Sequence, residues 1–311
     1  MKSKEKVTVG GQAVMEGVMM RGPERVAVAV RKSDGTIVVK DRKFESVIKR
    51  FKPLGWPVLR GAVTLIESLV LGMKALSFSS DIAMEEENKK AGKHTEKSIW
   101  DNIWMGVTVV VSFVIGLGLF FYIPLILTDL FPIESGIVFN IIDGIFRVVI
   151  FLIYIYLISL WKEIKRVFEF HGAEHKSVFA FEDQKELSIE SARSYTTLHP
   201  RCGTSFLLIV MLVSILVFMF LGRPETIADR FLRIAFVPLI GGLSYEFIRF
   251  ADRAPERSFL KYLVYPGLWL QKITTKEPDD EQIEVAMVAL RCALGQEPKA
   301  GPSDVQMVEL S

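Results

Sequence analysis

The sequence predicts an α-helical integral membrane protein with about four transmembrane helices, a small N-terminal β unit and interfacial amphipathic helices. Half of the 311 residues are hydrophobic, and the mean hydropathy is +0.32. Residues 103–128 and 202–222 contain no charged residue, and about 20 apolar residues are enough for a helix to cross the hydrocarbon core of a bilayer. Short runs near the N-terminus alternate between apolar and polar residues, which predicts a β unit there.

Residues 1–53 form the predicted cytoplasmic β-rich unit. Val26–Val30 and Ile37–Lys40 alternate as strands do, and Ser33-Asp34-Gly35 between them is a typical turn sequence. A glycine-rich motif, residues 10–23, precedes this hairpin and contains four glycines and a proline. Such a composition indicates tight turns, bulges or close approach of the backbone to a ligand.

Residues 54–100 are predicted to form an interfacial amphipathic helix followed by a linker. Charges recur at intervals of seven within residues 54–78, at Arg60, Glu67 and Lys74. A helix with this pattern keeps its charges on one stripe, so it could lie in the membrane surface or pack as an amphipathic helix on the β unit. The charged run 85–98 is expected to be a solvated linker or helix end, with His94 exposed to solvent.

Residues 101–161 are assigned to transmembrane helices 1 and 2, and residues 202–250 to helices 3 and 4. The individual apolar segments are 103–128, 137–161, 202–222 and 231–250. In the second segment Asp143 and Arg147 stand at i and i+4, where they can pair. Pro238 and two glycines interrupt the fourth segment and predict a kink, and Glu246 and Arg249 are expected to pair within it.

The distribution of basic residues predicts the orientation of these helices. Residues 1–102 carry 19 Lys and Arg, residues 162–201 carry seven, and residues 129–146 carry none. Because Lys and Arg are retained on the cytoplasmic side, four spans with both termini in the cytoplasm fit these counts. The charged N-terminus lacks the apolar core of a cleavable signal peptide, so a multi-pass membrane protein with its N-terminus in the cytoplasm is expected.

The last part, residues 251–311, is predicted to be a cytoplasmic interfacial and helical tail. Phe259–Leu270 is rich in aromatic residues but too short to cross a bilayer, so it is expected at the interface. Gln282–Leu294 has helical periodicity. From Gly295 onward the content of Pro, Gly and Lys predicts a disordered end.

Metal-binding residue types are concentrated in the cytoplasmic loop at 162–201 and directly after it. Three of the four histidines and one of the two cysteines of the chain fall within 32 consecutive positions: His171, His175, His199 and Cys202. In a helix the first two stand at i and i+4 and point from one face. Two imidazoles at this spacing, a third imidazole and a thiolate suit zinc, with iron as the second choice. Cys202 has the alternative of being a small buried residue at the start of the third span.

Glu174 stands between the first two histidines and is the candidate catalytic residue. The sequence His171-x-x-Glu174-His175 matches the inverted zinc-protease motif, in which the carboxylate activates a water bound to zinc. Glu174 could instead form an outer hydrogen bond or an ion pair with Lys176 or Arg201. Four further residues are candidates for contact with a substrate: Glu16, Arg21, Arg201 and Glu246.

Two long motifs resemble a known family. Gly-Gly-Gln-Ala-Val-Met-Glu-Gly-Val-Met-Met-Arg-Gly-Pro, at residues 10–23, and the pair His-Gly-Ala-Glu-His-Lys and His-Pro-Arg-Cys-Gly-Thr-Ser-Phe, at residues 171–176 and 199–206, are similar to those of the YqhQ-like family of bacterial multi-pass membrane proteins of unknown function. The likeness extends from about residue 7 to residue 294. It implies a predicted metal-dependent enzyme in a membrane and leaves the reaction open.

Three classes of function are consistent with these features. The first is a membrane-embedded zinc-dependent hydrolase acting at the cytoplasmic face on a lipid or a membrane-associated peptide, with water at the fourth zinc position. The second is a scaffold or assembly factor in which four protein ligands close the zinc. The third is a transporter, which only the interrupted fourth span and its charges favour. The expected partner is the lipid bilayer. A net charge of +2 gives no indication of nucleic-acid binding.

Overall fold

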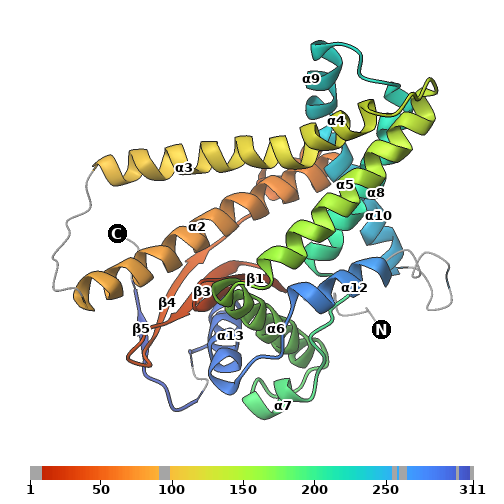
Figure 1. Ribbon diagram of the computed structural model, residues 1–311. Coiled ribbons are helices and arrows are strands. Elements are labelled where there is room, and N and C mark those ends of the chain that lie inside the picture. The colour runs from red at the N-terminus through yellow and green to blue at the C-terminus, as the bar shows by residue number, and fades with distance from the viewer. Residues whose placement is uncertain (1–8, 91–98, 254–257, 259–264, 299–300, 309–311) are drawn as a thin grey trace.

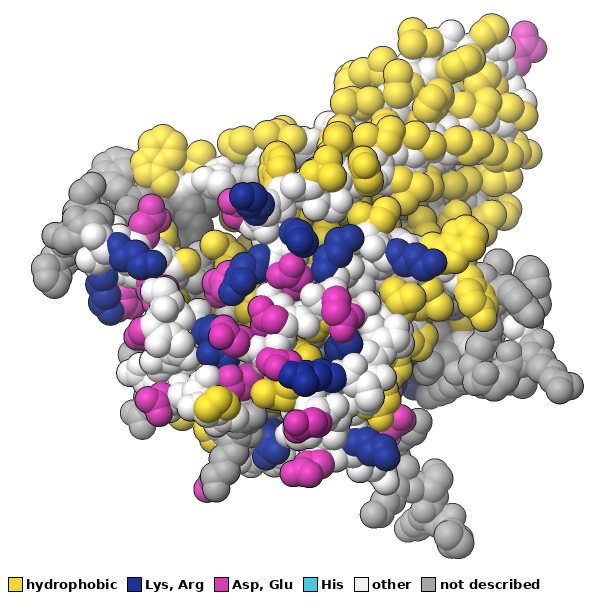
Figure 2. Space-filling view, turned by 60° about the horizontal axis from the view of Figure 1, so that its bottom comes forward, with side chains coloured by type: hydrophobic (Ala, Val, Ile, Leu, Met, Phe, Trp, Pro, Cys, Tyr) yellow, Lys and Arg dark blue, Asp and Glu magenta, His cyan; other side chains and the backbone are white. Residues whose placement is uncertain are grey.

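The chain folds into a polar unit built around a β-sheet and an apolar bundle of helices that extends from it. The computed structural model describes residues 9–90, 99–253, 258, 265–298 and 301–308. In Figure 1 the sheet lies low in the view, and α5, α8 and α10 rise away from it. Figure 2 shows charged side chains over the sheet unit and an almost continuous hydrophobic surface over the bundle. The predicted mostly helical protein with an N-terminal sheet is thus confirmed.

The sheet has five strands in the order of the sequence, β1-β2-β3-β4-β5. Their bounds are Gly10–Val14, Gly17–Arg21, Arg25–Arg31, Ile37–Lys43 and Val305–Met307. The first four are joined as antiparallel neighbours, and β5 pairs with β4 in parallel. The predicted hairpin is the β3–β4 pair, in which Val30 faces Val38. The glycine-rich motif adds two strands that the sequence analysis did not assign.

Both faces of the sheet are covered, because side chains alternate in direction along each strand. On one face Met20, Ala29 and Val39 pack with α6 (Lys162–Glu182) and α13 (Asp280–Ala293). On the other face Val28 and Val38 pack with α2 (Leu59–Lys90). This explains why β2 and β3 are buried almost throughout, unlike strands of a sheet with one face in water.

Two glycines of the first motif permit close contact between the sheet and its protein neighbours, whereas the sequence analysis expected tight turns, bulges or close approach to a ligand. A Cβ on Gly11 would lie 2.5 Å from the carbonyl oxygen of Met19 and 2.9 Å from Cγ of Glu174. A Cβ on Gly22 would lie 2.2 Å from the carbonyl oxygen of Ala293 in α13. The contacts involve protein groups, so these two glycines serve packing of the sheet.

Helix α2 has two different partners along its 32 residues. Its first turns lie against α10 (Val237–Arg253), where a Cβ on Gly61 would be 2.9 Å from Cα of Gly242. Further along, Leu71 and Ala75 pack on the sheet. The alternative of an amphipathic helix packed on the β unit therefore describes this half of α2. The helix continues to Lys90, beyond the predicted end near residue 78, and His94 lies outside the described residues.

In the part of the chain that the structure describes, five helices are long and apolar enough to cross a membrane. They are α2, the continuous segment at 106–129, α5 (Gly136–Ile158), α8 (Gly203–Leu221) and the segment at 227–251. The second comprises α3 (Ile99–Leu117), a π-helical turn η2 (Gly118–Tyr122) and α4 (Ile123–Asp129). The last is divided at Phe236 into α9 (Ile227–Ala235) and α10, which confirms the predicted break. The count exceeds the predicted four by α2.

The remaining short helices connect these parts. They are α1 (Val47–Arg50), the 3-10 helix η1 (Lys52–Gly55), α7 (Ile189–Arg193) and α12 (Tyr265–Thr274). The predicted interfacial segment at 259–270 falls within α12 from Tyr265 onward, and its earlier residues 259–264 lie outside the described residues. Its two aromatic residues at 265 and 269 are exposed.

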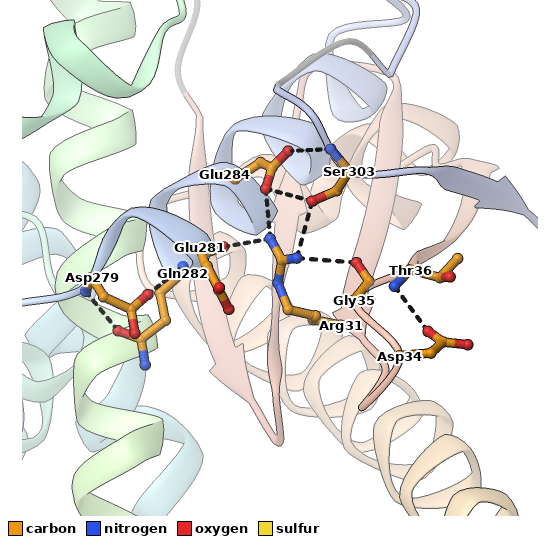
Figure 3. A network of polar contacts seen from close by, with 9 residues as sticks. All are labelled: Arg31, Asp34, Gly35, Thr36, Asp279, Glu281, Gln282, Glu284 and Ser303. Carbon is orange, nitrogen blue, oxygen red and sulfur yellow. Dashed lines mark hydrogen bonds and ion pairs between the residues drawn. The ribbon is translucent and has the colours of Figure 1, made fainter.

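The predicted disordered end is wrong for residues 301–308, because β5 forms there. Arg31 of β3 donates to Glu284 of α13 at 2.6 Å and to the hydroxyl of Ser303 at 3.0 Å (Figure 3). Ser303 in turn donates to Glu284 through its backbone N–H and its hydroxyl. These buried, charge-assisted hydrogen bonds tie the tail to the sheet edge, and composition alone does not reveal them.

Candidate metal centre

The structure brings His171, His175 and Cys202 together. The two histidines stand one turn apart on α6, and Cys202 is the N-cap residue of α8. One ligand atom from each residue lies within 4.8 Å of the ligand atoms of the other two, the one such group of histidine, cysteine and carboxylate residues in the described part of the chain. Nε2 of His171 is 3.2 Å from Sγ of Cys202. Two histidines one helical turn apart thus meet a cysteine at the start of a different helix.

Backbone carbonyls orient both imidazole rings. Nδ1 of His171 is 2.8 Å from the carbonyl oxygen of Thr274, at the end of α12. Nδ1 of His175 is 2.5 Å from the carbonyl oxygen of Thr197. A carbonyl oxygen can only accept, so each Nδ1 carries the proton and each Nε2 keeps its lone pair. Metal-binding histidines are commonly held in this way.

Cys202 presents its sulfur to hydrogen-bonding groups at the start of α8. Its Sγ accepts a hydrogen bond from the backbone N–H of Thr204 at 3.4 Å, and the Thr204 hydroxyl is 3.1 Å from it. The N-terminal end of a helix carries a partial positive charge that stabilises an anion. The alternative of an inert buried cysteine at the start of the span accounts for its burial but not for the histidine nitrogen beside its sulfur.

The donor set fits zinc. Two imidazole nitrogens and one sulfur match its preferred ligands, and bonds of about 2.1 and 2.3 Å place tetrahedral ligand atoms about 3.5 Å apart. The observed separations, from 3.2 Å to at most 4.8 Å, require a movement of about 1 Å or less to reach that geometry. Magnesium and calcium prefer oxygen ligands, so the three residues do not suit them.

Glu174 lies beside this group and is held by the glycine-rich motif. The backbone N–H of Gly11 in β1 donates to its carboxylate at 2.9 Å. The carboxylate is buried, and burial raises its pKa above the ordinary value, while nearby His171 and His199 act in the opposite direction. Burial also lowers the pKa of His175, which favours the neutral ring that a metal requires. Of the alternative roles for Glu174, the hydrogen bond is present, to Gly11, whereas Lys176 and Arg201 pair with Glu277 and Glu182 instead.

His199 lies next to the three-residue group, outside it. Its ring centroid is 5.6 Å from that of His175. Its Nδ1 accepts from the backbone N–H of Arg201 at 3.2 Å, and its Nε2 is 3.6 Å from a carboxylate oxygen of Glu182. Gln271 of α12 fixes the position of this histidine by accepting from its backbone N–H and donating to its carbonyl oxygen.

Three of the candidate substrate-binding residues have partners elsewhere. Glu16 pairs with Arg166 of α6, and Arg21 pairs with Glu67 of α2 at 3.3 Å. Glu246 forms two hydrogen bonds with Arg60, which joins α10 to α2, so the predicted pairing with Arg249 is wrong. Arg201 is the one of the four that stays near the centre, through its ion pair with Glu182.

Sequence patterns did not identify several residues that shape the centre. The carbonyl groups of Thr197 and Thr274 act through the backbone, for which side-chain patterns give no signal. Gln271 and Glu182 are different, because an amide inside an apolar, aromatic segment and a carboxylate on the face of a histidine helix are visible in the sequence. Gln271 is fully buried, which indicates a structural or functional partner.

The centre lies at the boundary between the polar unit and the apolar bundle. Cys202 begins the apolar helix α8, whereas the two histidines belong to α6, which packs on the sheet. Helix α12, whose last residue anchors His171, exposes Trp269 and Tyr265. These features define a class of protein, in which a polar sheet unit with a His2Cys group is joined to helices apolar enough to cross a membrane.

Comparison with known proteins identifies the family. The chain belongs to the DUF1385 family of proteins of unknown function, whose profile matches residues 56–296. It is 36% identical over 300 residues to the "Uncharacterized protein YqhQ" of Bacillus subtilis (strain 168), with 92% of each chain covered. The resemblance carried by the glycine-rich and histidine motifs is therefore confirmed. No solved structure matches the chain.

Proposed function

We propose that this protein is a zinc-dependent hydrolase of the bacterial inner membrane, acting at the cytoplasmic face on an amphipathic substrate such as a lipid or a membrane peptide. The observation that carries the proposal is the group formed by His171, His175 and Cys202. Catalytic zinc sites keep three protein ligands and leave one position for water, whereas structural sites use four.

The chemistry would be divided between the metal and Glu174. Zinc held by the three residues would lower the pKa of a bound water and polarise an ester or amide carbonyl. Glu174 would accept a proton from that water, because burial raises the pKa of its carboxylate and makes it a stronger base than an exposed carboxylate. Its bond from Gly11 fixes one oxygen, which keeps the carboxylate in place beside the histidines.

The position of the centre favours an amphipathic substrate. Cys202 stands at the first turn of an apolar helix, and exposed Trp269 and Tyr265 lie on the neighbouring helix α12. Aromatic residues of this kind are enriched where membrane meets water. A substrate with one end in the bilayer could thus reach the centre without leaving the membrane.

The fold also favours four crossings, with α2 remaining on one side. Strand β4 comes before α2, helix α6 lies between α5 and α8, and β5 comes after the last apolar helix, yet all three belong to the sheet unit. An even number of crossings must therefore separate each from the next. Three apolar helices lie between β4 and α6. Because half of α2 packs on the sheet, α2 is the helix that does not cross.

Labelling from the two sides of the membrane tests this topology. Tags at the N-terminus, between residues 183 and 188 and at the C-terminus should all report from the cytoplasm, as the excess of Lys and Arg there requires. A tag in the connection 130–135 should report from the outside. Periplasmic or extracellular labelling of the 183–188 tag would contradict the proposed orientation.

A structural zinc site is the second candidate, and one observation favours it. The ring of His199 lies 5.6 Å from that of His175, so a modest shift could bring a fourth protein ligand to the metal. Zinc would then join α6, the loop that carries His199 and the start of α8, without space for water. In that case the protein would act as a membrane scaffold or assembly factor.

Two substitutions distinguish the candidates in a deletion strain. Glu174→Gln is nearly isosteric, so a hydrolase should keep zinc and abundance but lose complementation. Under the scaffold hypothesis Glu174→Gln would complement fully, whereas His199→Ala would remove zinc and lower the amount of protein. Glu163→Gln, an exposed carboxylate on the same helix, is the matched control. Full complementation by Glu174→Gln would end the hydrolase proposal.

A further inference from the structure

A second polar cluster lies inside the apolar bundle, at the end next to α9. It consists of Asn140, Asp143 and Arg147 of α5 and Arg233 of α9, and we refer to it as the arginine cluster. These side chains are between 1% and 7% exposed. Phe218, which lies against both arginines, is 16 residues along α8 from Cys202, or about 24 Å. The arginine cluster is therefore separate from the candidate metal centre.

The cluster is held together by specific contacts. Arg147 donates to Asp143 at 2.8 Å, and Arg233 donates to the side-chain oxygen of Asn140 at 2.8 Å and to the carbonyl oxygen of Gly222 at 2.5 Å. The two guanidinium groups lie 5.3 and 4.8 Å from the centre of the Phe218 ring. Cation–π contacts of this kind stabilise desolvated arginines but add no negative charge.

The charges within the cluster do not balance. It contains two guanidinium groups and one carboxylate, and buried charge in an apolar bundle is costly unless it is paired. Two carboxylates on adjoining segments are engaged otherwise. Asp129 pairs with Arg223 at 2.8 Å, and Asp229 caps α9 through Thr226. The four residues of the cluster thus carry one excess positive charge among themselves, and Asp229 attracts Arg233 from outside without a hydrogen bond to it.

Three of its buried polar atoms lack a hydrogen-bond partner among the described residues. Two are donors, Nε of Arg147 and Nη1 of Arg233, and the third is an acceptor, Oδ1 of Asp143. Buried polar groups in folded proteins nearly always have partners, so these three atoms require a partner that the described side chains do not supply, such as an ion. A ligand that completes the cluster must offer anionic oxygens to the two donors and one hydrogen to the acceptor.

We propose that the arginine cluster binds a singly charged phosphate group that keeps a P–OH, either dihydrogen phosphate or the singly protonated phosphate monoester of a lipid. Its anionic oxygens accept from Arg147 and Arg233, and its P–OH donates to Asp143. One negative charge neutralises the excess positive charge. Asn140 acts as a positioning residue, because its amide donates to the carbonyl oxygens of Gly136 and Gly222 while its oxygen fixes Arg233.

The unpartnered carboxylate oxygen of Asp143 makes the expected binding specific for phosphate over sulfate. Sulfate has the shape and anionic oxygens of phosphate but has no proton to donate near neutral pH. A site with only the two arginines would bind both anions, whereas the carboxylate oxygen would repel sulfate. Discrimination between these two anions therefore tests the arrangement of all three unpartnered atoms.

The experiment measures thermal unfolding of the full-length protein in a phosphate-free, uncharged detergent. Titration with sodium phosphate should raise the midpoint of unfolding, because a ligand that binds the folded state stabilises it. Sulfate at equal ionic strength should bind at least about tenfold more weakly, the expected cost of an unmade hydrogen bond to a charged group. Asp143→Asn, whose amide can donate, should bring the two anions to within about threefold of each other.

Variants of the arginines test the donors. Arg233→Gln should weaken phosphate binding at least about tenfold, whereas Arg223→Gln should leave it unchanged, since Arg223 is exposed and pairs with Asp129. If Arg233→Gln does not fold, Arg147→Lys supplies the same test, because it keeps the charge but removes the Nε donor.

A second arm identifies the source of the phosphate. The protein is placed in phosphatidylcholine bilayers that contain either phosphatidic acid, a monoester, or phosphatidylglycerol, a diester without a P–OH. Stabilisation by phosphatidic acid alone identifies a lipid ligand, and stabilisation by inorganic phosphate alone identifies a soluble one. No stabilisation by either, equal stabilisation by phosphate and sulfate, or unchanged phosphate binding in Arg147→Lys would overturn the proposal.

Discussion

The two polar clusters of this protein lie toward opposite ends of α8 and differ in how their hydrogen bonds are completed. In the candidate metal centre, His171 and His175 each use Nδ1 on a backbone carbonyl, so the remaining nitrogens point at Cys202. In the arginine cluster, Arg147 and Arg233 are fixed by neighbours yet keep buried donors without partners. In both clusters, hydrogen bonds to neighbouring groups position side chains that keep further binding atoms. The metal centre suits a cation, and the arginine cluster suits an anion.

Removing a metal ligand should give the largest effect and would show that the first cluster is a metal site. His171→Ala should purify without zinc, because loss of even an outer-shell partner commonly weakens metal binding about 10–100-fold and loss of a ligand more. Elemental analysis of the purified protein measures this. His94→Ala, outside the motif, should keep about one zinc per chain. If the double variant His171→Ala/His175→Ala kept its full zinc content, these residues would not form a metal site.

The arginine cluster should show the next largest effect, on stability. Arg147→Met leaves Asp143 buried without its ion-pair partner, so unfolding should become easier by about 3–5 kcal/mol. Arg223→Met also breaks an ion pair, but the pair is exposed and its loss should cost less than about 1 kcal/mol. Denaturant unfolding in detergent gives both values. Equal effects of the two substitutions would show that burial of the cluster does not govern its energetics.

A smaller effect is expected where the sheet meets the metal centre. In Gly11→Ala the new methyl group would overlap the carbonyl oxygen of Met19 and approach Glu174, so it should cost about 1–3 kcal/mol and displace the carboxylate. Gly10→Ala has no atom within 4 Å of the new group and should change stability by less than about 0.5 kcal/mol. Thermal unfolding and complementation of a deletion strain measure the two effects. A silent Gly11→Ala would mean that the bond to Glu174 is dispensable.

The smallest effect concerns Cys292, which serves as an internal control for Cys202. Burial raises the pKa of the Cys292 thiol to about 11, so at pH 8 it stays protonated and should resist alkylation in the folded protein. Iodoacetamide should modify Cys202 only after a chelator removes the metal. Mass spectrometry of the peptides identifies the modified thiol. Labelling of Cys202 at the same rate before and after chelation would show that no metal protects it.

Local chemistry in the sequence was enough to predict several features. The spacing of His171 and His175 places them on one face of a helix whatever surrounds it, because successive turns bring residues i and i+4 together. Long uncharged segments predict apolar helices, and alternation predicts the β3–β4 hairpin. The choice of Cys202 as a ligand follows from the same concentration of metal-binding residue types.

Tertiary structure decided which distant groups meet. Gly11 and Glu174 are 163 positions apart, and their hydrogen bond exists only because β1 packs on α6. Gln271 holds the backbone of His199 beside the three-residue group, and the pairing of Glu246 with Arg60 depends on the contact between α10 and α2. Periodicity describes which face a residue occupies, but the element that covers this face is selected by packing between segments far apart in the chain. The arginine cluster shows the same difference. The i, i+4 spacing predicts the pair of Asp143 and Arg147, whereas Arg233 reaches these residues only through the tertiary contact of α9 with α5.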